Sequence, residues 1–395
     1  MTIRHQLRWG GLFICVAAIL MSGMNIVVHA GYHTALIQAV YGLGFTGLVL
    51  AGVVLYVAQA RRTGWAGRLA YFVSGLGLIY ANVATFLSLA ELAGHPEVHA
   101  ALVAVWETLP IVRLAVYGVF LGLTLTGLTA AQAGVFSSWA GIAVALGVTL
   151  QLPAQFARGI AGPLFFIFTI GGSALFGAGL AWMGWQLWSG SAAGQPAAGQ
   201  PLAEAHRRWG GPLVIIAGGL FSLNALLNNL GELSLIDGIS HLLMYTSLVF
   251  ASPVWHIAQA HQAGRLGLAG FLLTHLGATL SIIPACLIMA QLAGAVPDNA
   301  ALMVAWVDLP VGRAGDYMTL AGLFLLGLGT LRAGVFPRWT GWLVLAGLAV
   351  ILPTYFVTQP YLFLVFWAIG ATLTGAALAV IGGRVLRPAC AGRRL

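Results

Sequence analysis

The chain has 395 residues, of which 60% are hydrophobic and only 7% are Asp, Glu, Lys or Arg, whereas roughly 25% of the residues in ordinary soluble domains are charged. So few charges cannot cover the surface of a soluble protein of this length, and the composition therefore excludes that class and predicts an integral membrane protein. The net charge of +8 is what basic cytoplasmic loops require. Because the sequence contains no basic stripe with interleaved aromatic residues, we expect the lipid bilayer, and not nucleic acid, to be its partner.

The first half of the chain contains six apolar runs, each of which predicts a membrane-spanning helix. A helix of about 20 residues crosses a hydrocarbon core about 30 Å thick. The six predicted helices cover residues 9–30, 33–59, 69–93, 109–131, 139–156 and 163–188. The first run could pass for a secretory signal peptide. We interpret it as a retained helix, because the Arg8-Trp9-Gly10-Gly11 sequence that opens it recurs at 208–211.

A linker and a second copy of this pattern follow. Residues 191–207, where Ala-Ala-Gly-Gln-Pro occurs twice, form a predicted cytoplasmic linker. Six further predicted helices cover residues 209–231, 233–258, 267–293, 309–331, 339–358 and 361–384. At a constant offset of 200 residues, one set of residues recurs: Trp106, Pro110, Arg113 and Tyr117 align with Trp306, Pro310, Arg313 and Tyr317. The sequence therefore predicts an all-α transmembrane bundle of twelve helices in two six-helix repeats, residues 1–190 and 208–395.

The arginines predict how these helices cross the membrane. All 17 basic residues are Arg. If both termini are cytoplasmic, most of these arginines lie at cytoplasmic helix ends, which is the arrangement that the positive-inside rule favours. Six is an even number, so both repeats insert in the same sense and are related by a pseudo-twofold axis along the membrane normal. We expect the inner membrane of a bacterial cell.

Ionisable residues inside the predicted spans are the first candidates for a site, because burying them in lipid is costly. Arg113 and Arg313 occupy equivalent positions near the outer end of the fourth helix of each repeat, where arginine can anchor to lipid headgroups or face a ligand. Acids at the same level are Glu107 in the first repeat and Asp308 or Asp316 in the second. Asp316 follows Arg313 by three residues, which favours an ion pair on one helix face.

Two prolines mark a second feature that both repeats share. Pro153 and Pro353 lie inside the short fifth helix of each repeat, where proline leaves a backbone carbonyl unpaired or ends the helix early. Matched helix breaks in two halves are typical of transporter binding sites. The hypothesis is therefore a small-molecule cavity between the repeats, toward the outer face. It would be lined by both arginines and both prolines, with the acids as counter-charges.

Histidines and cysteines favour no cofactor strongly. His241 and His275 lie within spans of the second repeat, and ligation of a haem would need two histidines at similar depth. They are expected to differ in depth by roughly 6 Å, which counts against haem ligation. A haem- or quinone-binding subunit of a redox complex is therefore kept only as the alternative to the leading interpretation. The three cysteines form no metal-binding pattern. No catalytic motif is present, so we expect no enzyme and no required cofactor.

Two loop motifs carry a resemblance. They are Gln259-Ala260 followed by Gly264-Arg265-Leu266-Gly267-Leu268-Ala269-Gly270, and the run Arg332-Ala333-Gly334-Val335-Phe336-Pro337-Arg338-Trp339-Thr340-Gly341. Through these motifs each half resembles the DUF4386-like class of small polytopic bacterial membrane proteins. This resemblance implies a helical membrane fold and no activity. The leading interpretation is a non-enzymatic protein that is transporter-like or binds a small molecule or lipid. The remaining alternative is a structural membrane anchor, with homo-oligomers or a membrane complex as partners.

Overall fold

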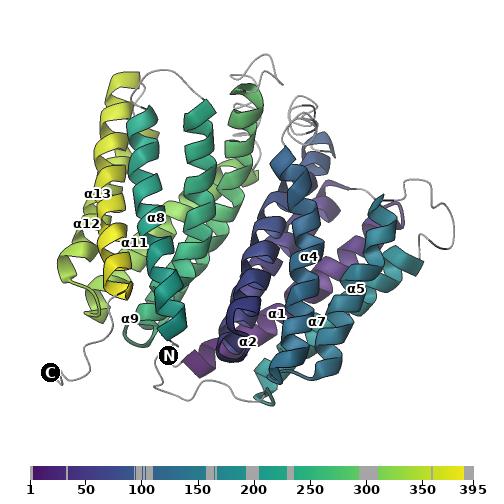
Figure 1. Ribbon diagram of the computed structural model, residues 1–395. Helices are drawn as coiled ribbons and strands as arrows, with labels where there is room; N and C mark the ends of the chain where they lie inside the picture. Colours follow the sequence, from purple (N-terminus) through teal and green to yellow (C-terminus); the bar gives the residue numbers. More distant parts are fainter. Residues whose placement is uncertain are drawn as a thin grey trace, which may run out of the picture. The chain divides into compact units, whose positions relative to one another are not determined.

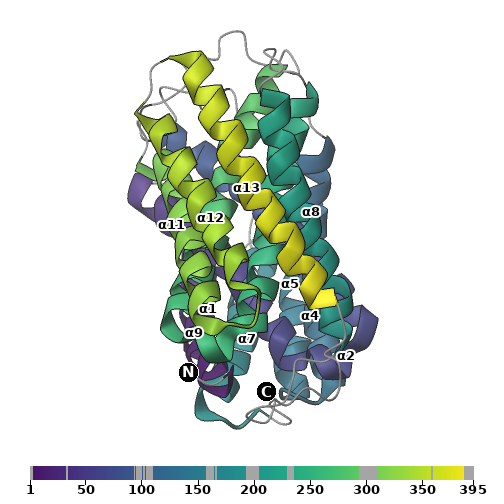
Figure 2. The same ribbon diagram turned by 90° about the vertical axis from the view of Figure 1, so that its left-hand side faces the viewer.

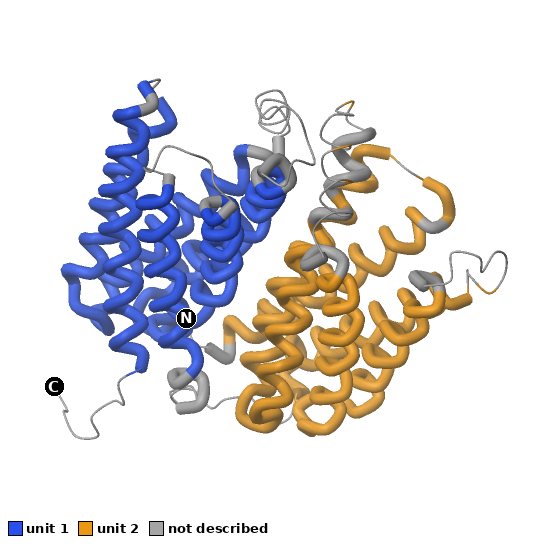
Figure 3. Tube along the Cα trace, turned by 45° about the horizontal axis from the view of Figure 1, so that its top comes forward, with its two compact units in different colours: residues 1, 200–395 blue, residues 2–199 orange. Residues whose placement is uncertain are grey.

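The structure is a computed structural model that describes residues 3–32, 34–92, 94, 100, 103, 110–156, 164, 167–192, 204–228, 235–292, 310–356 and 359–386. The chain divides into two compact units, residues 2–199 and 200–395 (Figure 3). We call them the N-terminal unit and the C-terminal unit. The boundary between them lies inside the predicted linker.

Every regular element in the described part of the chain is helical, which confirms the predicted all-α class (Figure 1). The N-terminal unit contains α1 (Ile3–His29), α2 (Ala35–Leu92), α4 (Pro110–Ala133), α5 (Ser138–Phe156), the π-helical turn η1 (Ile167–Gly171) and α7 (Gly172–Ser189). Their composition explains this, since a segment in lipid must pair all its backbone polar groups internally and a helix does so within itself.

The C-terminal unit repeats this order of elements. It contains α8 (Glu204–Asn228), α9 (Leu235–Leu292), α11 (Pro310–Ala333), α12 (Arg338–Ile351), the 3₁₀ turn η2 (Leu352–Tyr355) and α13 (Pro360–Leu386). The bounds of α2 and α9, and those of α4 and α11, differ by 200 residues. In this unit α13 packs against α8 and α12 (Figure 2).

The two longest helices are each a hairpin of two helical arms. The arms of α2 meet at Gly64 (φ 58°, ψ −135°) and those of α9 meet at Gly264 (φ 59°, ψ −137°), a backbone conformation that only glycine adopts readily. Tyr56 and Tyr71 stack across the first turn with ring centroids 4.8 Å apart. Because these tyrosines stand eight residues before and seven residues after Gly64, the two arms must run side by side in opposite directions.

Eight of the described helices are long and apolar enough to cross a membrane, and α2 and α9 are among them. The apolar stretch of α5, Ser138–Pro153, is shorter. Length and composition therefore agree with the membrane class that the sequence predicts.

Glycines set the distance between neighbouring helices in each unit. A Cβ atom on Gly77 of α2 would overlap the backbone at Val119 of α4, and one on Gly122 of α4 would overlap the backbone at Ser74. The equivalent contact between α9 and α11 uses Gly277 and Gly322. Small residues at these crossings let the backbones approach closely, which is how membrane helices gain packing energy without a hydrophobic drive.

Candidate functional site

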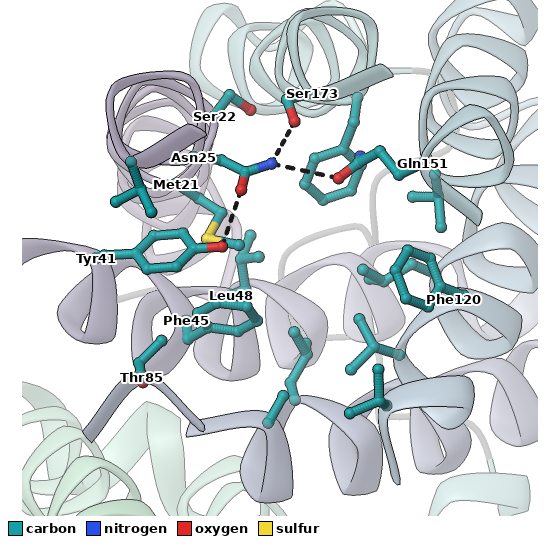
Figure 4. Close-up of a pocket in the computed structure, with 18 of the residues that line it drawn as sticks. Met21, Ser22, Asn25, Tyr41, Phe45, Leu48, Thr85, Phe120, Gln151 and Ser173 are labelled. Atoms are coloured by element: carbon teal, nitrogen blue, oxygen red, sulfur yellow. Dashed lines mark hydrogen bonds between the residues drawn. The ribbon is translucent and has the colours of Figure 1, made fainter. Parts of the chain in front are cut away.

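A pocket of about 360 Å³ lies among the helices of the N-terminal unit. Its walls come from α1, both arms of α2, α4, α5 and α7, so every large helix of the unit contributes to it (Figure 4). The volume falls in the range of small-molecule sites, roughly 300–1,000 Å³.

Most of the wall of this pocket is apolar. The apolar lining consists of Met21, Val28, Phe45, Leu48, Leu78, Ala81, Val116, Val119, Phe120, Leu123, Val148 and Phe176. The polar lining side chains are Ser, Thr, Asn, Gln and Tyr, and none of the lining residues is Asp, Glu, Arg or His. Such a lining favours an uncharged molecule, because a charged one would lose its hydration without gaining a counter-charge.

One side of the pocket carries a network of neutral hydrogen bonds centred on Asn25 of α1 (Figure 4). The Asn25 amide donates to Oε1 of Gln151 on α5 (3.3 Å) and to Oγ of Ser173 on α7. The hydroxyl of Tyr41 on α2 donates to Oδ1 of Asn25 (3.0 Å). The network therefore connects four helices and fixes polar groups at the pocket wall.

Ser22 supplies a polar group that this network does not use. Its side chain lies on α1 and lines the pocket, is 8% exposed, and its Oγ has no hydrogen-bond partner among the described residues. A buried hydroxyl without a partner costs about 1–3 kcal/mol. Its Oγ is enclosed next to Gly177 of α7 and is not accessible from the pocket.

The C-terminal unit has an acid among the equivalent helices. Oδ1 of Asp316 on α11 accepts hydrogen bonds from the hydroxyl of Tyr245 (2.9 Å) and from the hydroxyl of Ser281 (2.7 Å). Tyr245 and Ser281 are buried and lie on the two opposite arms of α9. Asp316 is partly exposed and lies about 9 Å along α11 from its first residue, by helical rise.

The structure brings few of the charged candidates together. Arg313 is exposed on α11, and the expected ion pair between Arg313 and Asp316 is absent from the described interactions. The Asp316 carboxylate points toward α9, whereas Arg313 lies on the outside of the unit. Arg113 lies in α4, but its side chain, like Glu107 and Asp308, lies outside the described residues.

The two prolines occupy different local structures. Pro153 lies inside α5, which continues to Phe156. Pro353 lies in the 3₁₀ turn η2, which follows the end of α12 at Ile351. Only in the C-terminal unit, therefore, does the α-helix stop before the proline.

The two histidines of the haem alternative have different surroundings. Nδ1 of His241 lies 3.0 Å from the Asn224 amide, and its ring lies 5.3 Å from that of Tyr245. His275 is fully buried, with Nδ1 3.0 Å from the backbone oxygen of Val249. Among the described residues no group of three or more His, Cys, Asp or Glu side chains is placed to hold a metal ion.

Comparisons with known proteins leave the site without a precedent. No protein-family model, no curated protein and no solved structure matches the chain. The DUF4386-like resemblance therefore has no support from these comparisons, and the site must be interpreted from its own geometry.

The network around Asn25 was missed by sequence reasoning, which searched for charged residues and for residues that both repeats share. Asn25, Gln151 and Ser173 are neutral, and the residues 200 positions later are Ala225, Ile351 and Leu373. The signal that could have found them is this difference, because a polar residue in a span is costly where its counterpart is apolar.

Proposed function

We propose that the chain is a twelve-helix membrane protein that arose by tandem duplication of a six-helix unit. The matched bounds of α2 with α9 and of α4 with α11 support this, as do the turns at Gly64 and Gly264 with nearly equal dihedral angles. Each hairpin supplies two crossings, since its apolar stretch of 48 or 50 residues is more than twice the roughly 20 residues that one crossing needs. The shorter α5 and α12 complete six crossings per unit.

Both termini lie in the cytoplasm of a bacterial cell in this proposal, and the protein lies in the inner membrane. The turn of the α2 hairpin carries Arg61, Arg62 and Arg68, and the turn of the α9 hairpin carries Arg265. Positive residues of this kind favour the cytoplasmic side. With an even number of crossings per unit, both turns then face the same side.

The function we propose is non-enzymatic binding of a small, uncharged and largely apolar molecule, in a transporter-like or carrier role. The pocket of about 360 Å³ in the N-terminal unit carries this proposal. Its apolar walls would bury the body of the molecule, while Asn25 and Tyr41 would orient one polar group. We place the site here and not beside Arg313, because Arg313 is exposed and a charged ligand has no partner in this pocket.

Photolabelling tests the proposal directly. The probe is a medium-chain alkyl alcohol that carries a diazirine, applied to the full chain in lipid nanodiscs and mapped by mass spectrometry. We expect adducts on pocket residues such as Phe45, Phe120 and Leu123. The carboxylate analogue of the probe should label these residues at least tenfold less, because its charge would be buried without a partner.

A matched pair of variants on α4 provides the control. Leu123→Trp places a larger side chain in the pocket, because Leu123 is 9% exposed and lines it, whereas Leu121→Trp points outward from a position that is 57% exposed. Labelling in the pocket should fall at least fivefold in Leu123→Trp and stay unchanged in Leu121→Trp. Equal labelling in both variants, or labelling confined to outward-facing residues, would contradict the proposed site.

A further inference from the structure

The acid of the C-terminal unit has a set of neighbours that the binding pocket does not explain. Asp316 lies within a candidate membrane span that covers Arg313–Ala333. A carboxylate within a span is costly to insert, and acids in spans are therefore candidates for a functional site by default. The neighbours of Asp316 must therefore offset the free-energy cost of burying its charge.

Hydrogen bonds offset part of this cost. The hydroxyls of Tyr245 and Ser281 both donate to the same oxygen, Oδ1 of Asp316, and hydrogen bonds to a charged group are stronger than those between neutral groups. Asp316 forms no ion pair with any residue that the structure describes. The negative charge can therefore still be neutralised, either by a proton or by a bound cation.

The oxygen atoms around Asp316 favour a proton over a metal ion. A hard divalent metal ion takes about six oxygen ligands, whereas the oxygens gathered here are the carboxylate and the hydroxyls of Tyr245 and Ser281. Both hydroxyls already direct their hydrogens at Asp316. A carboxylate held in this way can gain a proton without the further oxygen ligands that a metal ion would need.

A second titratable group lies on the other side of Tyr245. The His241 ring lies 5.3 Å from the Tyr245 ring, and His241 is close enough to Asp316 for their charges to interact. The Asn224 amide lies 3.0 Å from Nδ1 of His241 and 3.1 Å from the hydroxyl of Ser240. The Tyr245 side chain therefore contacts both the Asp316 carboxylate and the His241 ring.

The remaining titratable or charged neighbours are few in the described part of the unit. Tyr355 of η2 lies within electrostatic range of Asp316, and its ring lies 5.4 Å from that of Tyr317. Arg313 and Tyr317 lie on α11 itself and are exposed. Tyr355 is 39% exposed, so both rings of this tyrosine pair reach the surface of the unit.

We propose that Asp316 is a proton-binding site inside the C-terminal unit, linked through Tyr245 to His241. Binding adds one proton from water to a carboxylate oxygen of Asp316, forms one O–H bond and removes one negative charge. Release returns the proton to water, and no electrons are transferred. The site lies in a different unit from the pocket and does not depend on the ligand proposed there.

Protonation would also change how α9 and α11 hold each other. The ionised carboxylate accepts from both arms of α9, whereas the neutral acid is a weaker acceptor and becomes a donor itself. The helices α9 and α11 pack closely at Gly277 and Gly322, so a change in these hydrogen bonds acts on a tight contact. The proton could in this way alter the packing of the unit.

The test observes the carboxyl group of Asp316 as a function of pH. The chain contains four aspartates, Asp237, Asp298, Asp308 and Asp316, so labelling aspartate with ¹³C at the side-chain carboxyl gives a simple spectrum of the full chain in nanodiscs. We expect one signal to titrate within the pH range over which the protein stays folded, and to be absent in Asp316→Asn. If that variant does not fold, Asp316→Glu removes the same signal, because glutamate is unlabelled.

Two tyrosine variants give the matched control. Tyr245→Phe removes a hydrogen bond to Asp316 and should move the midpoint of its titration by roughly one pH unit, whereas Tyr41→Phe in the N-terminal unit should leave it in place. A signal that stays in one protonation state across this range would overturn the proposal. A midpoint that follows the sodium chloride concentration would overturn it as well, in favour of a metal cation.

Discussion

Three positions at the centre of each unit differ in chemistry while the helices around them correspond. The N-terminal unit carries Phe45, Ala81 and Val116, and 200 residues later the C-terminal unit carries Tyr245, Ser281 and Asp316. The first three line a pocket, and the last three form one hydrogen-bonded cluster. Similarly arranged helices can therefore hold a neutral pocket in one unit and a hydrogen-bonded acid in the other.

The largest expected effect concerns the frame that the two units have in common. Gly122→Leu and Gly322→Leu each place a side chain against the backbone of the neighbouring hairpin, at Ser74 and Thr274. Overpacking costs about 1–3 kcal/mol, and more where backbones must separate, so both variants should lose monodispersity or unfold at clearly lower temperature. Size-exclusion chromatography and thermal unfolding in detergent would measure this.

Two glycines without close neighbours provide the control for the frame. No atom lies within 4 Å of a Cβ built on Gly52 or Gly219. Leucine at these positions should therefore leave the unfolding temperature nearly unchanged. If only one of the two crossing variants were destabilising, the helices would not pack in the same way within the two units. That result would contradict the correspondence between the units.

A transplant of the acid tests whether these three positions are enough to form the hydrogen-bonded cluster. Val116→Asp should destabilise the N-terminal unit by roughly 2–3 kcal/mol, because the new carboxylate lies in a span without hydroxyl partners. Adding Phe45→Tyr and Ala81→Ser supplies both hydroxyls and should restore about half of the loss. Unfolding of the single and triple variants would measure the recovery, and equal stability of the two would show that the cluster needs more than these residues.

The smallest expected effect concerns the network at the pocket wall. Tyr41→Phe removes the hydrogen bond to Oδ1 of Asn25 and should lower the free energy of unfolding by about 1 kcal/mol. It should also weaken photolabelling by the alcohol probe by less than Leu123→Trp does, since it leaves the pocket volume unchanged. A larger loss of labelling in Tyr41→Phe would mean that the hydroxyl itself binds the probe.

The helical arrangement of each unit could be predicted from the sequence because it depends on residue patterns with a known physical cause. Runs of apolar residues indicate spans, and the conformations of Gly64 and Gly264 agree with the turns expected between the second and third helices of each repeat. The residues of the candidate site were harder to predict from the sequence. Arg313 stood out by its charge, and the structure shows that its side chain is exposed on the C-terminal unit.

Asp316 shows where sequence reasoning was partly right. It was selected as an acid in a span, but the spacing from Arg313 suggested an ion pair, whereas the structure gives it Tyr245 and Ser281 from a hairpin about 30–70 residues away in the chain. Partners at such separations follow from packing and leave no local pattern. The same holds for Asn25, whose partner Gln151 lies 126 residues away.

A density map of the full chain in lipid nanodiscs, saturated with the uncharged alcohol probe, tests most directly whether the two units have different interiors. We predict non-protein density in the N-terminal unit beside Asn25 and Tyr41. In the C-terminal unit the side chains of Tyr245, Ser281 and Asp316 should fill the corresponding space. Probe density beside Asp316, with the N-terminal pocket closed by its own side chains, would contradict the account.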